Sequence, residues 1–125
     1  NRKSLADRVQ RIYDNRERIQ VFDLDARDFL HLPFPDNSFF FIDPPYFLKG
    51  GQLYKNFFTE QDHVEIAKIV KELNYPWVVT YDNVDEIKTI YSFNDGIEYE
   101  LSYTVEKKYI GSEIMFYRQD LDINI

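Results

Sequence analysis

The chain has 125 residues, of which 44% are hydrophobic and 30% are charged, and it contains no cysteine. This composition fits one soluble domain in a reducing compartment, for which we expect the cytoplasm, and it excludes a disordered tail, a disulfide scaffold and a thiolate metal site. The net charge of −7 argues against nucleic-acid binding by charge alone, although residues 1–18 hold six Arg or Lys against three acids. No apolar run approaches the roughly 20 residues of a membrane span, so no membrane partner is expected.

The first part of the chain predicts one long helix and two strands. Apolar residues at helical spacing indicate an amphipathic helix over residues 2–17. A short apolar strand is expected over residues 19–24, then a short turn or helix at 28–30 and a proline-containing loop at 33–37. Residues 38–43 are apolar without alternation, which is typical of a strand buried on both faces of a parallel sheet.

The middle of the chain predicts a helix, a strand and a second helix. Thr59 begins a capping-box pattern, and the apolar face that follows it runs to Leu73. Residues 77–81 predict another buried strand. Asp82 and Asn83 then stand where a side chain can cap the next helix.

The end of the chain predicts a hairpin. Residues 97–105 alternate between apolar and polar, which indicates a strand with one wet face. Residues 107–112 are expected to connect it to a last strand over 113–118. Strand–helix alternation that closes with a hairpin predicts an α/β fold, with a mostly parallel sheet and a C-terminal antiparallel hairpin.

The outstanding motif is Asp43-Pro44-Pro45-Tyr46, called the tetrad below, which directly follows a predicted buried strand. In open α/β sheets, ligands bind beyond the carboxyl ends of the strands. The Asp43 carboxylate and the Pro44 carbonyl can accept the two hydrogens of an exocyclic amine on a flat base, which prepares the nitrogen to attack an electrophile. The two prolines hold the backbone extended and add no N–H donor. A proline-rich turn with a packed tyrosine is the plain structural alternative.

The tetrad resembles the D-P-P-Y motif of the Dam-like DNA adenine-N6 methyltransferases, which depend on S-adenosylmethionine. The similarity continues through an F-T-x-x-x-H pattern that ends at His63, and it includes Asp28 and Phe29 upstream and residues 111–115 downstream. The resemblance implies an incomplete Rossmann-like methyltransferase sheet. It also implies methyl transfer from S-adenosylmethionine to the exocyclic amine of adenine in double-stranded DNA.

The resemblance makes Asp43, Pro44, Pro45 and Tyr46 the expected catalytic residues. Asp43 and Pro44 would orient and polarise the amine. Tyr46 would stack on an adenine that has been taken out of the duplex. On this interpretation the ring of Tyr46 matters more than its hydroxyl.

The resemblance also implies binding residues for the cofactor and for DNA. Asp28 and Phe29 are expected to contact the adenine of S-adenosylmethionine, and Asp43 is expected to face its amino group. Lys49 and Lys55 flank the loop after the tetrad, where they would contact DNA phosphates. For both lysines a solvated position is the alternative, and no metal is expected.

Two parts of the family pattern are not found in this sequence, the glycine-rich cofactor loop and the target-recognition domain. Both precede the tetrad in this family, and the only methionine is Met115, so we expect residues 1–125 to be the C-terminal part of a catalytic domain and inactive alone. The strand at 38–43 would then keep an open edge, to be covered by residues 19–24, a second copy or a complementing N-terminal part. The recognised DNA sequence, and a solitary or restriction-modification role, stay open.

Two other interpretations stay open. A non-catalytic remnant of the same fold would keep the tetrad without transferring a methyl group. Asp23 and Asp25 follow an apolar strand as in haloacid-dehalogenase-type phosphatases, but Arg27 stands where that family has Thr or Val. His31 and His63 lack the spacing of a zinc site, and His63 is expected to be a structural hydrogen-bonding residue.

Overall fold

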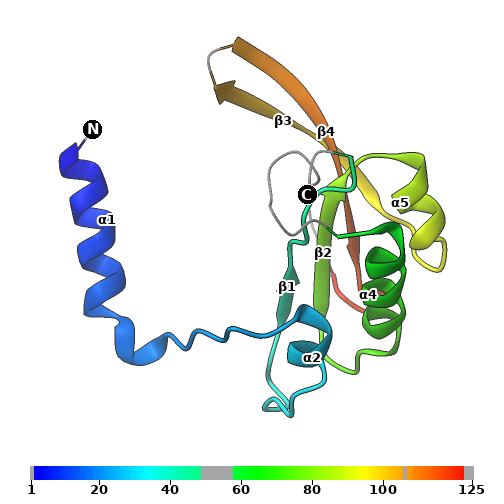
Figure 1. Ribbon diagram of the computed structural model, residues 1–125, viewed down its shortest axis with the longest axis horizontal. Coiled ribbons are helices and arrows are strands. Elements are labelled where there is room, and N and C mark those ends of the chain that lie inside the picture. The colour runs from blue at the N-terminus through cyan, green and yellow to red at the C-terminus, as the bar shows by residue number, and fades with distance from the viewer. Residues whose placement is uncertain (1, 49–57, 106, 123–125) are drawn as a thin grey trace.

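The computed structural model describes residues 2–48, 58–105 and 107–122, which form an arm and a body (Figure 1). The arm comprises residues 2–24 and reaches away from the rest of the molecule. The body begins at Asp25 and contains a four-stranded sheet with its helices. No helix in these three stretches has the length and apolar content to cross a bilayer.

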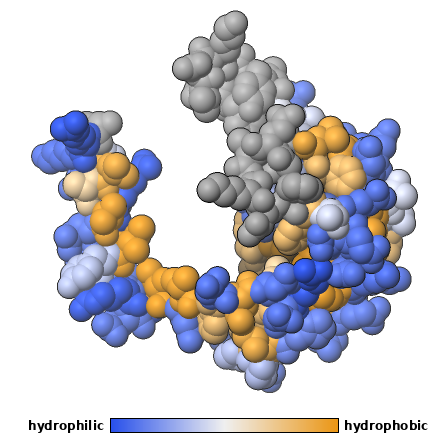
Figure 2. Space-filling view, in the orientation of Figure 1, coloured by the Kyte–Doolittle hydropathy of each residue, from blue (hydrophilic) through white to orange (hydrophobic). Residues whose placement is uncertain are grey.

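The arm consists of helix α1 (Arg2–Asp14), a single 3-10 turn at Arg16–Arg18 and an extended segment over residues 19–24. The helix is confirmed, yet its predicted apolar face lies in solvent, as the hydrophobic residues along the arm in Figure 2 show. The strand predicted over residues 19–24 is wrong. Because no described strand lies beside this segment, it forms no strand ladder, and Val21 is 88% exposed.

The sheet of the body has the order β1-β2-β4-β3. Strands β1 (Phe40–Ile42) and β2 (Trp77–Asp82) run parallel. Strand β4 (Lys107–Tyr117) is antiparallel to β2 and to β3 (Ile97–Val105). The fold is therefore mixed α/β. Among the described strands only β1 and β2 are parallel, so the mostly parallel Rossmann-like sheet stays a prediction. The prediction that residues 107–112 are a connection is wrong, because they belong to β4 and pair with residues 100–105 of β3.

The described residues of the body form three helices: α2 (Ala26–Leu30), α4 (Glu60–Glu72) and α5 (Asp85–Ile90). The capping box that begins α4 is confirmed, since Thr59 and Asp62 bond each other's backbone N–H groups. The prediction that Asp82 and Asn83 cap α5 is wrong. Asp82 is still part of β2, and the N-cap of α5 is Val84, whose apolar side chain cannot make a cap bond.

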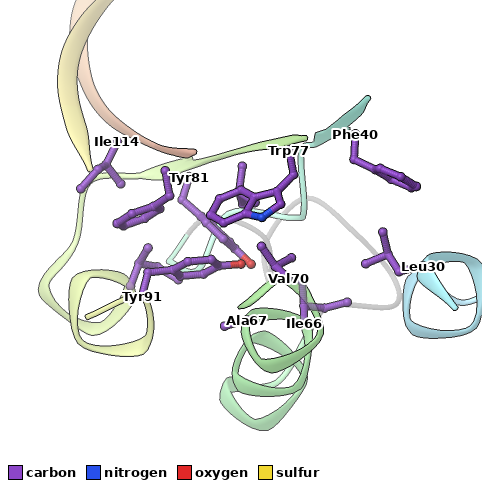
Figure 3. Packing of buried hydrophobic residues seen from close by; sticks show 12 residues of the cluster. Leu30, Phe40, Ile66, Ala67, Val70, Trp77, Tyr81, Tyr91 and Ile114 are labelled. Atoms are coloured by element: carbon purple, nitrogen blue, oxygen red, sulfur yellow. The ribbon is translucent and has the colours of Figure 1, made fainter. Parts of the chain in front are cut away.

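The core lies between one face of the sheet and helices α4 and α5, where Figure 3 shows Tyr81, Tyr91 and Val70 turned toward one another. The ring of Tyr91 stacks on Phe116, with centroids 4.6 Å apart and an interplanar angle of 15°. Burial raises the pKa of the Tyr81 and Tyr91 hydroxyls above their ordinary value. Much of the aromatic content of the chain therefore serves to fill this core.

Strand β1 lies at the edge of the sheet, and the prediction that it is buried on both faces is wrong. Only Phe40 is buried, while the side chains of Phe39 and Phe41 are 55% and 65% exposed. In the described parts of the chain nothing pairs with the outer edge of β1, and residues 19–24 do not move onto it. The tetrad thus begins at the end of an edge strand.

Candidate active site

The tetrad follows β1 at its carboxyl end, beside the end of β2. Asp43 is exposed, Pro44 is buried, and Pro45 and Tyr46 are half-buried. The hydroxyl of Thr80, on β2, donates to Oδ1 of Asp43 at 2.9 Å. This bond orients the carboxylate from the neighbouring strand and keeps it open toward solvent, where it can accept a hydrogen from a ligand.

A cavity of about 290 Å³ runs along β1 and onto the tetrad. Its walls come from α2, β1, the tetrad and α4, and Figure 3 shows Leu30 of α2 facing Ile66 of α4 near Phe40. Most of the side chains in these walls are apolar, and Asp43 supplies the carboxylate. A mostly apolar cavity with a single charged group is suited to a flat, weakly polar ring.

The structure brings together two of the three residues that were predicted to meet the cofactor. Phe29 and Asp43 both line the cavity, whereas Asp28 is exposed and is not part of its walls. The ring of Phe29 is fixed between Phe22 and Phe34, at centroid distances of 5.3 and 5.1 Å. Helix α2 therefore contributes an aromatic wall to the cavity.

Arg27 fixes helix α2 against helix α4. Its Nη1 atom lies 2.7 Å from both the Asp62 and the Glu65 carboxylates, while its other nitrogens bond Asp25 at 2.8 Å. Hydrogen bonds from Arg27 lower the pKa of Asp25 to about 2. Asp25 also accepts the Arg27 backbone N–H and so caps α2.

These contacts leave the phosphatase interpretation without support. Asp25 is occupied by Arg27, and Asp23 lies exposed in the arm. Within residues 2–48, 58–105 and 107–122, no group of three His, Cys, Asp or Glu side chains is arranged to hold a metal ion.

Tyr46 and the two residues after it are bonded to carboxylates that the sequence interpretation did not assign to the site. The Tyr46 hydroxyl donates to Oε1 of Glu113. The backbone N–H groups of Phe47 and Leu48 donate to the two oxygens of Asp82, at 2.8 and 3.1 Å. Both acids are buried in strands β2 and β4, and local sequence patterns carried no signal for these contacts.

His63 makes a buried hydrogen bond, as predicted for a structural residue. Its Nδ1 atom lies 3.0 Å from the Tyr81 hydroxyl, and its ring packs between Phe47 and Phe58. Burial lowers the pKa of His63, although the nearby charges of Asp82 and Asp62 act in the opposite direction. The DNA contacts predicted for Lys49 and Lys55 lie outside the described residues.

Residues 1–109 match the family model of the D12 class N6 adenine-specific DNA methyltransferases. The matched region contains the arm, α2, the tetrad, α4 and both Thr80 and Asp82. None of the curated proteins matches the chain.

Proposed function

The chain belongs to the D12 class N6 adenine-specific DNA methyltransferase family, and we propose that it forms the adenine-binding and part of the cofactor-binding site of such an enzyme. The proposed reaction transfers a methyl group from S-adenosylmethionine to the exocyclic amine of an adenine in double-stranded DNA. One observation carries this proposal. The Asp43 carboxylate is held by Thr80 at the end of a parallel strand and at the rim of an apolar cavity.

The residues of the cavity fit the adenine ring of S-adenosylmethionine. Phe29, Pro44 and Pro45 supply flat apolar walls, and Asp43 supplies a hydrogen-bond acceptor at the rim. When bound, the cofactor supplies an electrophilic methyl group, so the protein is required mainly to position the reactants.

The tetrad supplies the hydrogen-bond acceptors for the exocyclic amine of the substrate adenine. Asp43 accepts one of its hydrogens and the Pro44 carbonyl accepts the other, which directs the nitrogen lone pair toward the methyl group. Thr80 keeps the Asp43 carboxylate in one orientation, so less reorganisation is needed during the reaction. The ring of Tyr46 offers the flipped base a surface for stacking.

We propose further that a glycine-rich cofactor loop and a target-recognition domain complete this site in the working enzyme, as the family resemblance implies. The open edge of β1, with Phe39 and Phe41 beside it, is where a complementing N-terminal part or a second copy would pair. Sedimentation of the chain with and without the complementing part distinguishes these two partners of the β1 edge. On this view the isolated chain transfers no methyl group, and detectable transfer would contradict it.

The decisive experiment replaces Asp43 by alanine in a methyltransferase that contains this chain. Single-turnover transfer of labelled methyl groups to DNA should slow by a factor of a hundred or more, about 3 kcal/mol, while the affinity for S-adenosylmethionine falls less. Exposed Asp95, in the turn after α5, provides the matched control as Asp95→Ala. Near-normal transfer by the Asp43 variant would contradict the proposed role, and absence of transfer by the unaltered enzyme would favour a non-catalytic remnant.

A further inference from the structure

Three polar side chains lie on the face of the sheet opposite the aromatic core. Thr80 and Asp82 are two residues apart on β2 and therefore share a face. Glu113 is paired with Asp82 across β2 and β4, so its side chain lies on that face as well. All three are buried, with exposed fractions of 8%, 8% and 5%. Their neighbours Tyr81 and Ile114 occupy the other face and belong to the core.

These three side chains hold successive parts of one segment, residues 43–48. Thr80 bonds the carboxylate that begins the tetrad, and Glu113 accepts the hydroxyl of Tyr46 that ends it. Asp82 accepts the next two backbone N–H groups, one on each carboxylate oxygen. The segment is thus fixed at its first residue, at its aromatic side chain and along its exit from the site.

A structural role alone does not account for carboxylates at these two positions. Burying a carboxylate costs several kcal/mol unless hydrogen bonds compensate, and like charges placed opposite each other in a sheet repel. An apolar pair would avoid both costs, as the next pair along the ladder, Tyr81 and Ile114, does. Glu113 also accepts the Tyr99 hydroxyl at 2.8 Å, so donors from the segment and from β3 meet at the same carboxylate.

We propose that Asp82 and Glu113 are positioning residues for methyl transfer, acting through the tetrad rather than on the substrate. Asp82 fixes the backbone that leaves the tetrad. Glu113 fixes the Tyr46 ring through its hydroxyl, so that the stacking surface is set before DNA binds. The part played in methyl transfer rests on the proposed function, whereas the fixing of the segment does not. On this proposal the Tyr46 hydroxyl contributes more than was expected when the ring alone was taken to matter most.

The first test measures amide hydrogen exchange by NMR in this chain. In Asp82→Asn, an NH₂ group replaces one of the two carboxylate oxygens. It faces a backbone N–H group, and because both groups are donors, that hydrogen bond is lost. The Phe47 and Leu48 amides should exchange at least about tenfold faster, while the Val79 amide within β2 keeps its protection. The control Glu100→Gln, at an exposed position on β3, removes the same charge without touching the segment. Unchanged exchange at Phe47 and Leu48 would overturn the role of Asp82.

The second test is a double-mutant cycle in a methyltransferase that contains this chain. Tyr46→Phe and Glu113→Gln should each slow single-turnover transfer by about tenfold, with unchanged affinity for S-adenosylmethionine. Because Glu113 acts through the Tyr46 hydroxyl, the double variant should be no slower than the slower single variant. The role of Glu113 would be overturned if the rate losses of the two single variants multiplied in the double variant. It would also be overturned if either single variant transferred methyl groups at the normal rate.

The two tests separate this proposal from the proposed function. Absence of methyl transfer by the unaltered enzyme contradicts the proposed function, and exchange at Phe47 and Leu48 then decides the fixing of the segment by itself. If Asp82→Asn lowers the protection of Val79 as well, the variant has lost its fold, and the cycle with Tyr46 and Glu113 decides the proposal instead.

Discussion

Helices α1 and α4 have the same length, 13 residues, and similar amphipathic patterns, yet their surroundings are opposite. Helix α4 places four residues in the core: His63, Ile66, Ala67 and Val70. Helix α1 buries none of its residues and has no acidic residue in its first turn, whereas α4 has both an acidic first turn and a capping box. An apolar face therefore predicts a helix, but it does not predict that the helix finds a partner.

The difference has a physical origin in where helical stability comes from. An isolated helix shorter than about 12–15 residues is marginal in water, and most of the stability of a helix in a protein comes from packing its apolar face. The described hydrogen bonds along the arm include local ones, such as the bond from Gln10 Nε2 to Asp14 Oδ1 at 2.8 Å. Helix α4 instead packs on β2 and is tied to α2 by Arg27.

The largest expected effect is a difference in the free energy of unfolding between substitutions on the apolar face of α4 and on that of α1. Ile66→Ala in α4 should lower the free energy of unfolding by about 2–5 kcal/mol, because it leaves a cavity in the core. Ile12→Ala in α1 removes the same atoms from an exposed site and should change it by less than about 0.5 kcal/mol. Urea unfolding followed by the fluorescence of Trp77, the single buried tryptophan, measures both. Equal losses would mean that the arm packs on the body in solution.

A smaller effect on the free energy of unfolding is expected at the N-terminus of α4. Thr59→Ala removes the side chain that caps α4 and should cost about 1 kcal/mol, measured in the same unfolding experiment. Ser4→Ala in α1 serves as the matched control, since α1 is not part of the cooperative core. A loss of similar size from Ser4→Ala would contradict the independence of the arm.

The pH dependence of stability is expected to come from the body through His63. Because burial holds the pKa of folded His63 below its ordinary value of 6.5, the unfolded chain takes up a proton that the folded chain does not. The contribution of neutral His63 to the free energy of unfolding is therefore complete above pH 6.5, and it decreases as the pH falls below that value. Urea midpoints at pH 7.5 and 5.5 should differ less in His63→Gln than in the unaltered chain. The same decrease in both proteins would assign the effect to other groups.

The smallest effect concerns Arg27, because its ion pairs are partly exposed and solvent screening weakens them. Hydrogen bonds from Arg27 lower the pKa of folded Asp25 from 3.8 to about 2, so this stabilisation is present above pH 3.8 and is lost as the pH falls toward 2. Thermal melts of Arg27→Gln and of the unaltered chain should differ slightly at pH 7 and converge toward pH 2. A difference that persists at pH 2 would show that Arg27 acts by packing.

Features set by neighbouring residues could be predicted from the sequence. The capping box at Thr59 depends on residues three positions apart, and the place of the tetrad depends on the strand just before it. Asp82 could not be assigned, because an acid after a strand can cap a helix or accept distant N–H groups, and the choice depends on where Phe47 and Leu48 lie. The Glu113 contact depends on a register between strands that local patterns do not specify.

The exposure of β1 could not be predicted either. A run of apolar residues indicates what a strand can bury, but burial requires neighbours on both faces and both edges. Phe40 packs on Phe34 and Tyr75, whereas Phe41, on the opposite face, is 65% exposed.

The order of the strands also bears on how the molecule folds. Strands β3 and β4 are adjacent in the chain and pair along their length, so their ladder closes with little loss of chain entropy. Strand β1 pairs with β2 across a much longer connection that contains α4. Their ladder has only three register positions and begins with the pair of Phe40 and Trp77. We expect β1 to dock late in folding and to detach early in local opening, because few contacts compensate that loop closure. The tetrad thus directly follows the strand that we expect to open first.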